Sequence, residues 1–310
     1  MAHWSVPIGS ILCYNAIMNR IITYEIEKEY DSIFAFFKQK LIPRKIQVQL
    51  KQNPDRVLLN GKAVMLRTPL MAGDQLTLYI LEAEQSHITP VKMPLDIVYE
   101  DEDIVVIDKP AMLPVHPSIN HYEDTLANGL MYYFQNQDSP FVFRCLNRLD
   151  RDTSGLTLIA KNPFSAAMLS RQVKERGFHR TYTAIVEGDL PDEGTIHAPI
   201  ARAKESAILR EVNYESGQPA ITHYRCLERK NGLSLVSITL ETGRTHQIRV
   251  HMASIGHPLP GDFLYNPSNR QIARQALHSA SLSFAHPLTG EELKFVAPLP
   301  EDMRRLFSSH

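Results

Sequence analysis

The sequence predicts an α+β protein built of two units, and three observations lead to this prediction. Short β-branched and aromatic runs, typical of strands, recur along the chain with few helical patterns between them. A polar segment, residues 83–94, separates a smaller unit, residues 20–82, from a larger one, residues 95–306. The chain has 310 residues, of which 44% are hydrophobic, which is enough for two packed domains. Because the connecting segment is polar, we expect the units to fold independently.

The smaller unit has the clearest local signals. Residues 33–37 place apolar side chains at helical spacing, and Pro43 is expected to end this helix. Residues 57–59 lead into the dipeptide Asn60-Gly61, which favours a tight hairpin turn with residues 62–64 as the returning strand. Residues 75–80 are expected to form a further strand.

The larger unit is expected to alternate strands with two recognisable helices. Asn162 is a suitable cap for a helix that ends at Gly177. A second helix is expected to begin at Thr245 or a neighbour and to run to Ile255. The expected strands are residues 104–107, 143–149, 156–160 and 233–240.

Composition argues against several classes of protein. No apolar run approaches the roughly 20 residues of a membrane span, so no membrane partner is expected. The first residues lack the pattern of a secretory signal. The three cysteines are far apart and form no CxxC pair, which argues against a disulfide framework and a zinc site. We therefore expect a protein of the reducing cytoplasm.

The net charge of −1 hides two basic windows. Residues 38–67 contain eight positive side chains and one acid, and residues 144–180 contain eight positive side chains and three acids. Such segregated charge produces a local positive field that attracts phosphates even in a near-neutral protein. On charge alone, two solvated surfaces are the simpler interpretation.

The most informative stretch is residues 147–156, which places the carboxylate of Asp150 where a strand gives way to a tight turn. Arg148 and Arg151 flank this aspartate. A carboxylate at a strand end is held by a rigid scaffold and can face a cleft. Taken alone, Asp150 and Asp152 are more simply explained as ordinary turn-forming residues.

This stretch does not stand alone, because segments in the same order across residues 95–300 resemble the RluA family of pseudouridine synthases. Residues 147–156 resemble the family signature His-Arg-Leu-Asp followed by Thr-Ser-Gly. The smaller unit resembles, more weakly, the RNA-binding fold named after ribosomal small-subunit protein four. The other matching segments are residues 99–110, 114–117, 180–184, 242–252 and 277–290.

The resemblance implies a fold, an activity and roles for three residues. It implies a mixed, mostly antiparallel catalytic sheet with a central cleft, and isomerisation of a uridine to pseudouridine in structured RNA, either rRNA or tRNA. Asp150 is then the nucleophile, or the base that removes a sugar proton, and Arg249 is the cation that keeps it ionised. Tyr182 would stack on the uracil near the proton to be moved. No electrons are gained or lost, so no cofactor and no metal are expected.

Five basic residues are expected to contact the RNA. Arg148 matches the family arginine that enters the space left by the flipped nucleotide, where its planar group offsets part of the unstacking cost. Arg151 lies beside the same aspartate, and Arg44, Lys45 and Lys62 belong to the first basic window. We expect the protein to act as a monomer.

Each assignment has a simpler alternative. Tyr182 could be a core aromatic, and Arg249 a solvated charge on a helix. His246, His251 and His257 could suggest a metal site, but spacings of five and six residues put successive members on different helix faces. We therefore expect the three histidines to be structural.

Three residues depart from the family pattern: Asn147 stands where His is usual, Met112 where Gly is common, and Pro260 alters a later segment. We expect Asn147 to affect substrate fit rather than chemistry. The main alternative function is a non-catalytic RNA-binding or RNA-chaperone protein on the same fold, and a metal-dependent hydrolase is more distant. Binding alone would not require the intact set of Asp150, Tyr182 and Arg249.

Overall fold

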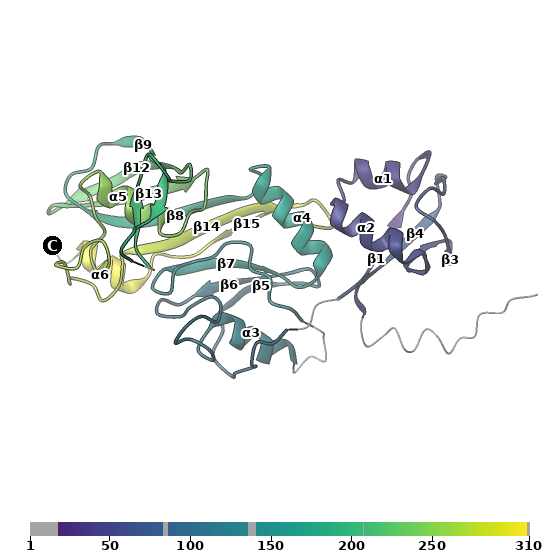
Figure 1. Ribbon diagram of the computed structural model, residues 1–310, viewed down its shortest axis with the longest axis horizontal. Helices are drawn as coiled ribbons and strands as arrows, with labels where there is room; N and C mark the ends of the chain where they lie inside the picture. The colour runs from purple at the N-terminus through teal and green to yellow at the C-terminus, as the bar shows by residue number, and fades with distance from the viewer. Residues whose placement is uncertain (1–17, 83–85, 136–140, 207, 309–310) are drawn as a thin grey trace, which may run out of the picture.

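The structure is a computed structural model that describes residues 18–82, 86–135, 141–206 and 208–308. Figure 1 shows an elongated molecule with the amino-terminal module at one end and α6 at the other. The segment in which no secretory signal is expected, residues 1–17, lies outside the described residues, as do residues 83–85 of the connecting segment. No helix within the described ranges is long and apolar enough to cross a bilayer.

The amino-terminal module is a four-stranded sheet covered by two helices. The expected hairpin turn is confirmed, with Asn60 and Gly61 both at positive φ. Pro43 does not end the first helix, which stops at Gln39; instead it immediately precedes a second helix, because a proline needs no hydrogen-bond partner for its nitrogen there. The elements are β1 Met18–Glu25, α1 Ile33–Gln39, α2 Arg44–Gln52, a 3₁₀ turn Pro54–Arg56, β2 Val57–Leu59, β3 Lys62–Ala63 and β4 Gln75–Leu81.

The larger unit is organised around a nine-stranded sheet. The pair β7–β14 is parallel and its other pairings are antiparallel, which confirms the expected mixed, mostly antiparallel architecture. In spatial order the strands are β5 Ile97–Glu100, β6 Ile104–Lys109, β7 Ser154–Ala160, β14 Leu277–Ala285, β8 His179–Glu187, β13 Leu233–Leu240, β12 Ile221–Lys230 and β9 Glu193–His197, with β15 Glu292–Val296 also paired to β14.

Helices and loops cover both faces of this sheet. Alternation along β6 shows the two faces directly: Val105 and Ile107 pack into one hydrophobic cluster, and Ile104 and Val106 into another. All four side chains are fully buried, which explains the continuous apolar run. The remaining elements are α3 Leu126–Gln135, α4 Pro163–Lys174, β10 Ile200–Arg202, β11 Arg210–Val212, α5 Gln247–Ser254 and α6 Glu301–Ser308.

The expected strand at residues 143–149 is wrong. This segment makes one isolated bridge, between Cys145 and Ile159, and is otherwise irregular. The buried side chain of Asn147 pairs with β7 in place of the backbone: its amide donates to the carbonyl of Leu156 at 2.9 Å, and its oxygen accepts from the nitrogen of Leu158 at 2.8 Å. A side-chain pair of this kind ends the regular ladder.

The expected start of α4 is confirmed, because the side chain of Asn162 accepts from the nitrogen of Ser165 at 2.8 Å. Its end differs by a few residues: the helix stops at Lys174, and Arg176 rather than Gly177 adopts the left-handed conformation. The two units, which we expect to fold independently, are in direct contact. Phe164 of α4 is fully buried within the hydrophobic cluster of the amino-terminal module.

Candidate active site

Asp150 lies in a tight turn just before β7. The carbonyl of Asp150 accepts from the nitrogen of Thr153 at 3.1 Å, which closes the turn. Gly155 follows at φ +107°, and a side chain there would collide with the backbone of Ser279 on β14. The glycine of the signature therefore lets β7 and β14 approach closely directly behind the turn.

Arg249 of α5 contacts this aspartate across the sheet. Its Nη1 donates to Oδ2 of Asp150 at 2.8 Å. The guanidinium is only 3% exposed, whereas the Asp150 side chain is 27% exposed. Oδ1 of Asp150 has no hydrogen-bond partner within the described part of the chain, so one carboxylate oxygen stays available.

Asp262 holds the other edge of the Arg249 guanidinium. Its two carboxylate oxygens accept from Nε and Nη2 of Arg249, both at 2.7 Å. Asp262 is fully buried and also accepts from the backbone nitrogens of Leu264 and Tyr265. Two-point contact with a planar guanidinium fixes its orientation, so the third nitrogen is aimed at Asp150.

The carboxylates of Asp262 and Asp150 keep the buried Arg249 protonated. Burial acts to lower the pKa of this guanidinium, but the hydrogen bond to Asp262 and the charge of Asp150 outweigh it and raise the pKa above its ordinary value. The Tyr265 ring also lies under the group, 5.0 Å from its carbon. Arg249 is therefore a permanent cation beside Asp150.

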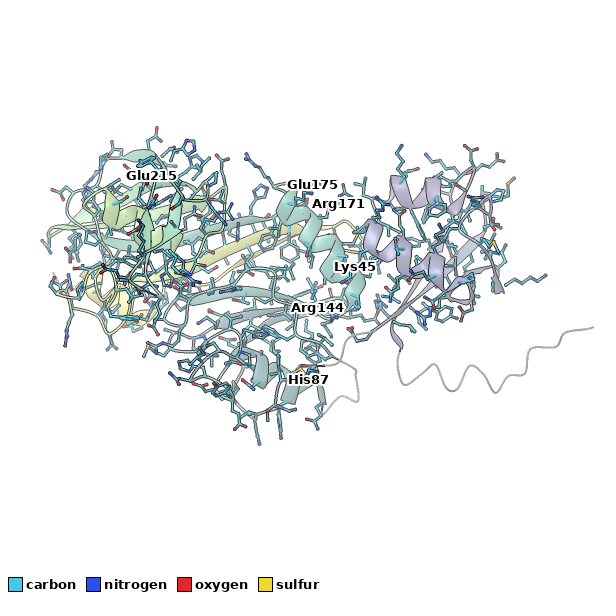
Figure 2. All side chains as sticks on the ribbon, in the orientation of Figure 1. Lys45, His87, Arg144, Arg171, Glu175 and Glu215 are labelled. Atoms are coloured by element: carbon cyan, nitrogen blue, oxygen red, sulfur yellow. The ribbon has the colours of Figure 1, made fainter. Side chains whose placement is uncertain are left out.

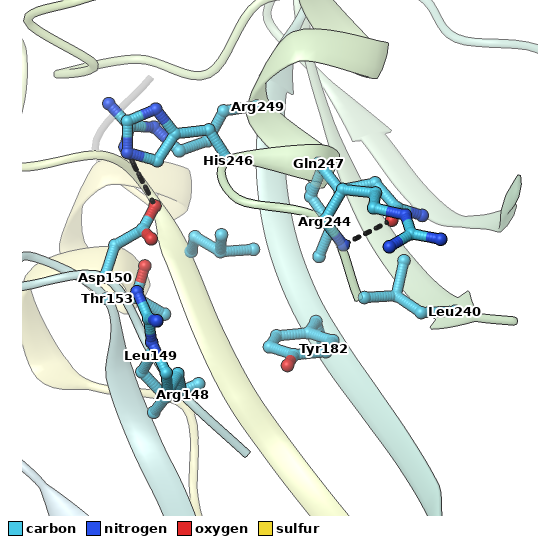
Figure 3. A pocket seen from close by; sticks show the side chains of 12 residues that line it. Arg148, Leu149, Asp150, Thr153, Tyr182, Leu240, Arg244, His246, Gln247 and Arg249 are labelled. Carbon is cyan, nitrogen blue, oxygen red and sulfur yellow. Dashed lines mark hydrogen bonds and ion pairs between the residues drawn. The ribbon is translucent and has the colours of Figure 1, made fainter. Parts of the chain in front are cut away.

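A small cavity of about 60 Å³ lies between these residues and Tyr182. Figure 3 shows Asp150 and Arg148 on one side of it, with Tyr182 and Arg244 on the other. Tyr182 is 5% exposed, and its hydroxyl makes no hydrogen bond among the described residues. Burial raises the pKa of this phenol, so it keeps its proton at neutral pH.

A larger groove, of about 730 Å³, adjoins the cavity. Arg148, Asp150 and Arg249 line both spaces, so Asp150 stands at their junction. Arg151 lines only the groove, where Asp152 holds it through two contacts of 2.7 and 3.0 Å. A long substrate can therefore occupy the groove while a single group enters the cavity.

Lys109 ties the Asp150 turn to the preceding loop. Its buried ammonium donates to the carbonyls of Pro110, Leu113 and Arg151 at 2.8, 2.8 and 3.0 Å. Burial lowers the pKa of Lys109 to about 7, against the opposing charges of Asp152 and Asp150. Three carbonyls match the three N–H groups of an ammonium, so this lysine acts as a brace for the turn.

The three histidines of the α5 region have separate surroundings. His251 is buried between the Thr222 hydroxyl and the Ala198 carbonyl, each 2.8 Å away, and Nδ1 of His257 contacts the Glu187 carbonyl. His246 differs, because its Nε2 lies 3.9 Å from Oδ2 of Asp150 and its ring lines the cavity. Burial lowers the pKa of His246, which favours the neutral ring.

The structure therefore brings four of the sequence-predicted residues, Asp150, Tyr182, Arg249 and Arg148, to one cavity and places Arg151 in the adjoining groove. Arg44, Lys45 and Lys62 lie in the amino-terminal module instead. Asn147 is not among the residues that line either space, and its side chain bonds to the backbone of β7 beside Arg148. Met112 has φ 65°, a conformation that favours the glycine common in the family.

Sequence reasoning did not find Asp262, His246 or Lys109 as parts of this site. The signal for Asp262 was weak but present. Gly261 precedes it at φ +72°, and a side chain on that glycine would collide with the carbonyl of Arg274, so the loop must pass close to other backbone. A carboxylate forced into such a loop requires a buried cation, and Arg249 supplies it.

Comparison with known proteins agrees with this geometry. Residues 103–254 match the family described as RNA pseudouridylate synthase. An uncharacterised RNA pseudouridine synthase of Bacillus subtilis, YjbO, is 41% identical over 86% of this chain and 94% of its own length. Ribosomal large subunit pseudouridine synthase D of Xanthomonas campestris pv. campestris is 36% identical over 91% of this chain and 88% of its own.

Solved structures give the same result. Human RNA pseudouridylate synthase domain containing 1 superposes with a TM-score of 0.55 at 28% identity, covering 69% of this chain and 86% of that one. The family match at residues 103–254 includes both Asp150 and Arg249. This chain therefore belongs to the RluA family of RNA pseudouridine synthases, enzymes that isomerise uridine to pseudouridine in RNA.

Proposed function

We propose that this enzyme isomerises a uridine of ribosomal large-subunit RNA, with Asp150 as the group that attacks or deprotonates the sugar. The observation that carries the catalytic assignment is the junction at Asp150: one carboxylate oxygen is held by Arg249, and the other faces the cavity beside Tyr182 without a partner among the described residues. The substrate class follows relatives named ribosomal large subunit pseudouridine synthase D, which support rRNA over tRNA.

The reaction requires five events at this place. The bond between ribose C1′ and uracil N1 breaks, the base turns, and C5 bonds to C1′. The C5 proton then leaves and N1 gains one, so atoms and electrons balance without an oxidant. Asp150 supplies the negative charge, Tyr182 offers a ring face to the detached uracil and a hydroxyl near the moving proton, and Arg249 holds one carboxylate oxygen in place.

The cavity and the groove hold different parts of the substrate. The target base enters the cavity, and the strand on either side follows the groove, with Arg148 at the border between them. Flipping a base costs a few kcal/mol, and the exposed Arg148 can fill the space that the base leaves. Arg151, and in the module Arg44, Lys45 and Lys62, contact phosphates; residues 20–82 thus bind RNA and residues 95–306 carry the reaction.

Two experiments test this proposal. Mapping pseudouridines in total RNA from cells with and without the gene should show one or a few large-subunit rRNA positions that depend on it; a change confined to tRNA would contradict the rRNA assignment. Tritium release from a transcript labelled at uridine C5 measures turnover directly. We expect turnover to persist in EDTA, because the reaction needs no redox step and no metal-activated water; loss that zinc or magnesium restores, with the RNA folded throughout, would favour metal chemistry.

We further propose that the enzyme acts as a cytoplasmic monomer. The proposed catalytic groups all come from one chain, so no second copy is needed to complete the site. Cys145 and Cys226 are both free thiols, which suits a reducing compartment. Light scattering of the pure protein with and without the rRNA transcript would measure the assembly state.

A further inference from the structure

The fold brings together the two basic windows of the sequence, which 76 residues separate in the chain. Helix α2 of the amino-terminal module packs against α4 of the larger unit. Phe164 of α4 is buried in the cluster of the module, and Met168, one turn later, packs against the same cluster. Arg171, on the next turn, donates to the carbonyl of Leu41 at 2.7 Å. The two units are therefore joined along one side of α4.

Positive side chains gather along this junction. Figure 2 shows Lys45 on α2 beside α4, which carries Arg171. Lys174 lies three residues after Arg171, on the same helix face, which is the face that reaches Leu41. We call this the α2–α4 basic surface, and its members are Lys40, Arg44, Lys45, Arg171, Lys174 and Arg176.

The acids on this surface are already matched. Glu175 accepts from Arg171 at 2.7 Å, and Glu241 accepts from Arg176 at 2.9 Å. Lys40, Arg44 and Lys174 are exposed and have no carboxylate partner within the described ranges. The surface therefore keeps an excess of cationic groups directed at solvent.

The same surface leads to the active site. Glu241, the partner of Arg176, directly follows β13, whose last residue Leu240 lines the cavity. Arg244, a few residues later, also lines it. Arg180 of β8 lies near Gly243. Its positive charge also acts on Tyr182, where it opposes the rise of the phenol pKa that burial causes. Cationic groups thus continue from the module to the rim of the cavity.

We infer that the α2–α4 basic surface binds the phosphate backbone of the RNA that flanks the target uridine, so that one RNA contacts both units at once. This inference rests on the proposed function, which supplies RNA as the partner. A chain of exposed cations ending at the cavity fits a polyanion whose modified nucleotide sits in that cavity. Because Phe164 fixes the module against α4, the RNA meets one rigid surface rather than two linked ones.

The test is a matched pair of double variants. Arg44→Gln with Lys174→Gln removes two charges from the surface, one from each unit. Lys230→Gln with Arg304→Gln removes the same two charges at the far end of the molecule, where Lys230 donates to the carbonyl of Ser308, the last residue of α6. Affinity is measured for a large-subunit rRNA transcript and for a short single-stranded oligonucleotide with one uridine, across a range of salt concentrations. Turnover on the transcript is measured by tritium release.

We expect the surface variant to bind the transcript about tenfold more weakly near 0.1 M salt, with a salt slope smaller by about 1.5, because each lost phosphate contact removes roughly 0.7–0.9 from the slope. The short oligonucleotide cannot span both units, so it should bind the variant about as it binds the wild type, and the loss of turnover on the transcript should lie in KM. The control variant should match the wild type throughout. Equal weakening in both variants, or none in the surface variant, would overturn the inference.

Two further readouts keep the result unambiguous. Thermal melting identifies a folding defect; if the double variant melts early, Lys174→Gln alone replaces it, with an expected slope change of about half. A wild-type protein that binds the transcript through this surface but releases no tritium would contradict the proposed substrate and leave the surface intact. A wild-type protein that turns over while the surface variant matches it would contradict the surface alone.

Discussion

Two aspartates of this protein each pair with an arginine from a distant part of the chain, and they differ in what surrounds the carboxylate. Asp103 is almost fully buried beneath α4 and has every oxygen engaged. Arg20 donates to both oxygens at 3.2 and 3.0 Å, and Asn162 and Ser165 donate to one of them at 2.8 and 2.7 Å. This carboxylate links the module to the larger unit, and each of its two oxygens accepts from a protein donor.

Asp150 has the same kind of partner and the opposite surroundings. Arg249 engages one oxygen, and the other is open to a cavity. Asp262, and not Asp150, fixes the orientation of that arginine, because it accepts from Nε and Nη2. An arginine–carboxylate pair is therefore no sign of a reactive site by itself; the sign is a carboxylate oxygen left without a donor beside an accessible space.

The same criterion, a carboxylate oxygen without a donor, applies to the cluster of side chains that most resembles a metal site. Among the described residues, Asp101, Asp103 and His286 have ligand atoms within 4.8 Å of one another. Asp101 accepts from Tyr99, from His286 and from two backbone nitrogens, and Arg20 occupies Asp103. Protein donors already satisfy these oxygens, so the cluster serves to hold segments together.

The largest effect that separates the two aspartates is expected from Asp150→Asn. The change is nearly isosteric but removes the charge, so turnover should fall by about 10⁴-fold or more while RNA affinity and melting temperature stay close to wild type. Tritium release and filter binding measure the two quantities. Near-normal turnover in this variant would show that another group does the chemistry.

A smaller loss of turnover is expected from Asp262→Asn. An amide cannot offer two charged oxygens to Arg249, so the guanidinium loses its fixed orientation toward Asp150. Misplacing a positioned group by about 1 Å costs roughly 10²-fold, and this loss should lie in kcat rather than KM. Steady-state kinetics on the rRNA transcript separates the two constants. A change in KM alone would mean that Asp262 acts on binding and not on the catalytic carboxylate.

Asp103→Asn should affect stability instead of turnover. Removing one member of this largely buried pair should lower the free energy of unfolding by about 2–3 kcal/mol, since Arg20 keeps some contact with solvent. Burial acts to raise the pKa of Asp103, but the hydrogen bond from Arg20 and those from Ser165 and Asn162 lower it overall. The stabilisation is therefore present above about pH 4 and is lost as the pH falls through the lowered value.

Denaturant unfolding of wild type and Asp103→Asn from neutral to acidic pH checks this sign. The difference between them should shrink as the solution becomes acidic, and kcat at a permissive temperature should be equal. A variant that unfolds like the wild type at neutral pH, yet turns over slowly, would reverse the assignment of the two aspartates.

The sequence indicated which residues meet at the cavity better than it indicated which residues hold the two units together. Asp150, Tyr182 and Arg249 lie in segments that resemble the family motifs. The resemblance implies that the three side chains share one site, and all three line the same cavity. Asp262 has no such segment, because its role depends on a loop that folds back across α5. The contact of α2 with α4 was likewise beyond a local reading, since it joins residues far apart in the chain.

Local structure was predictable where one residue decides it. The caps and turns at Asn162 and Asn60 depend on short-range hydrogen bonds and positive φ, and both are confirmed. The strand expected at residues 143–149 failed for a related reason. Its apolar side chains fit a strand, but the side chain of Asn147 competes for the backbone of β7, and this competition is visible only when the neighbour is known.

The smallest effect is expected at His246, the second group near Asp150. Burial lowers the pKa of this histidine, which favours the neutral ring at pH 7, and the ring gains a charge only as the pH falls below 6.5. His246→Gln therefore removes no charge from the site at neutral pH, in contrast to any change at Arg249. We expect turnover to fall only a few-fold, and the pH dependence of kcat between about pH 6.5 and 8 to match that of the wild type. Measuring kcat by tritium release across that range tests this; a lost ionisation in the variant would show that His246 is charged beside Asp150, and that the carboxylate depends on two cations and not on Arg249 alone.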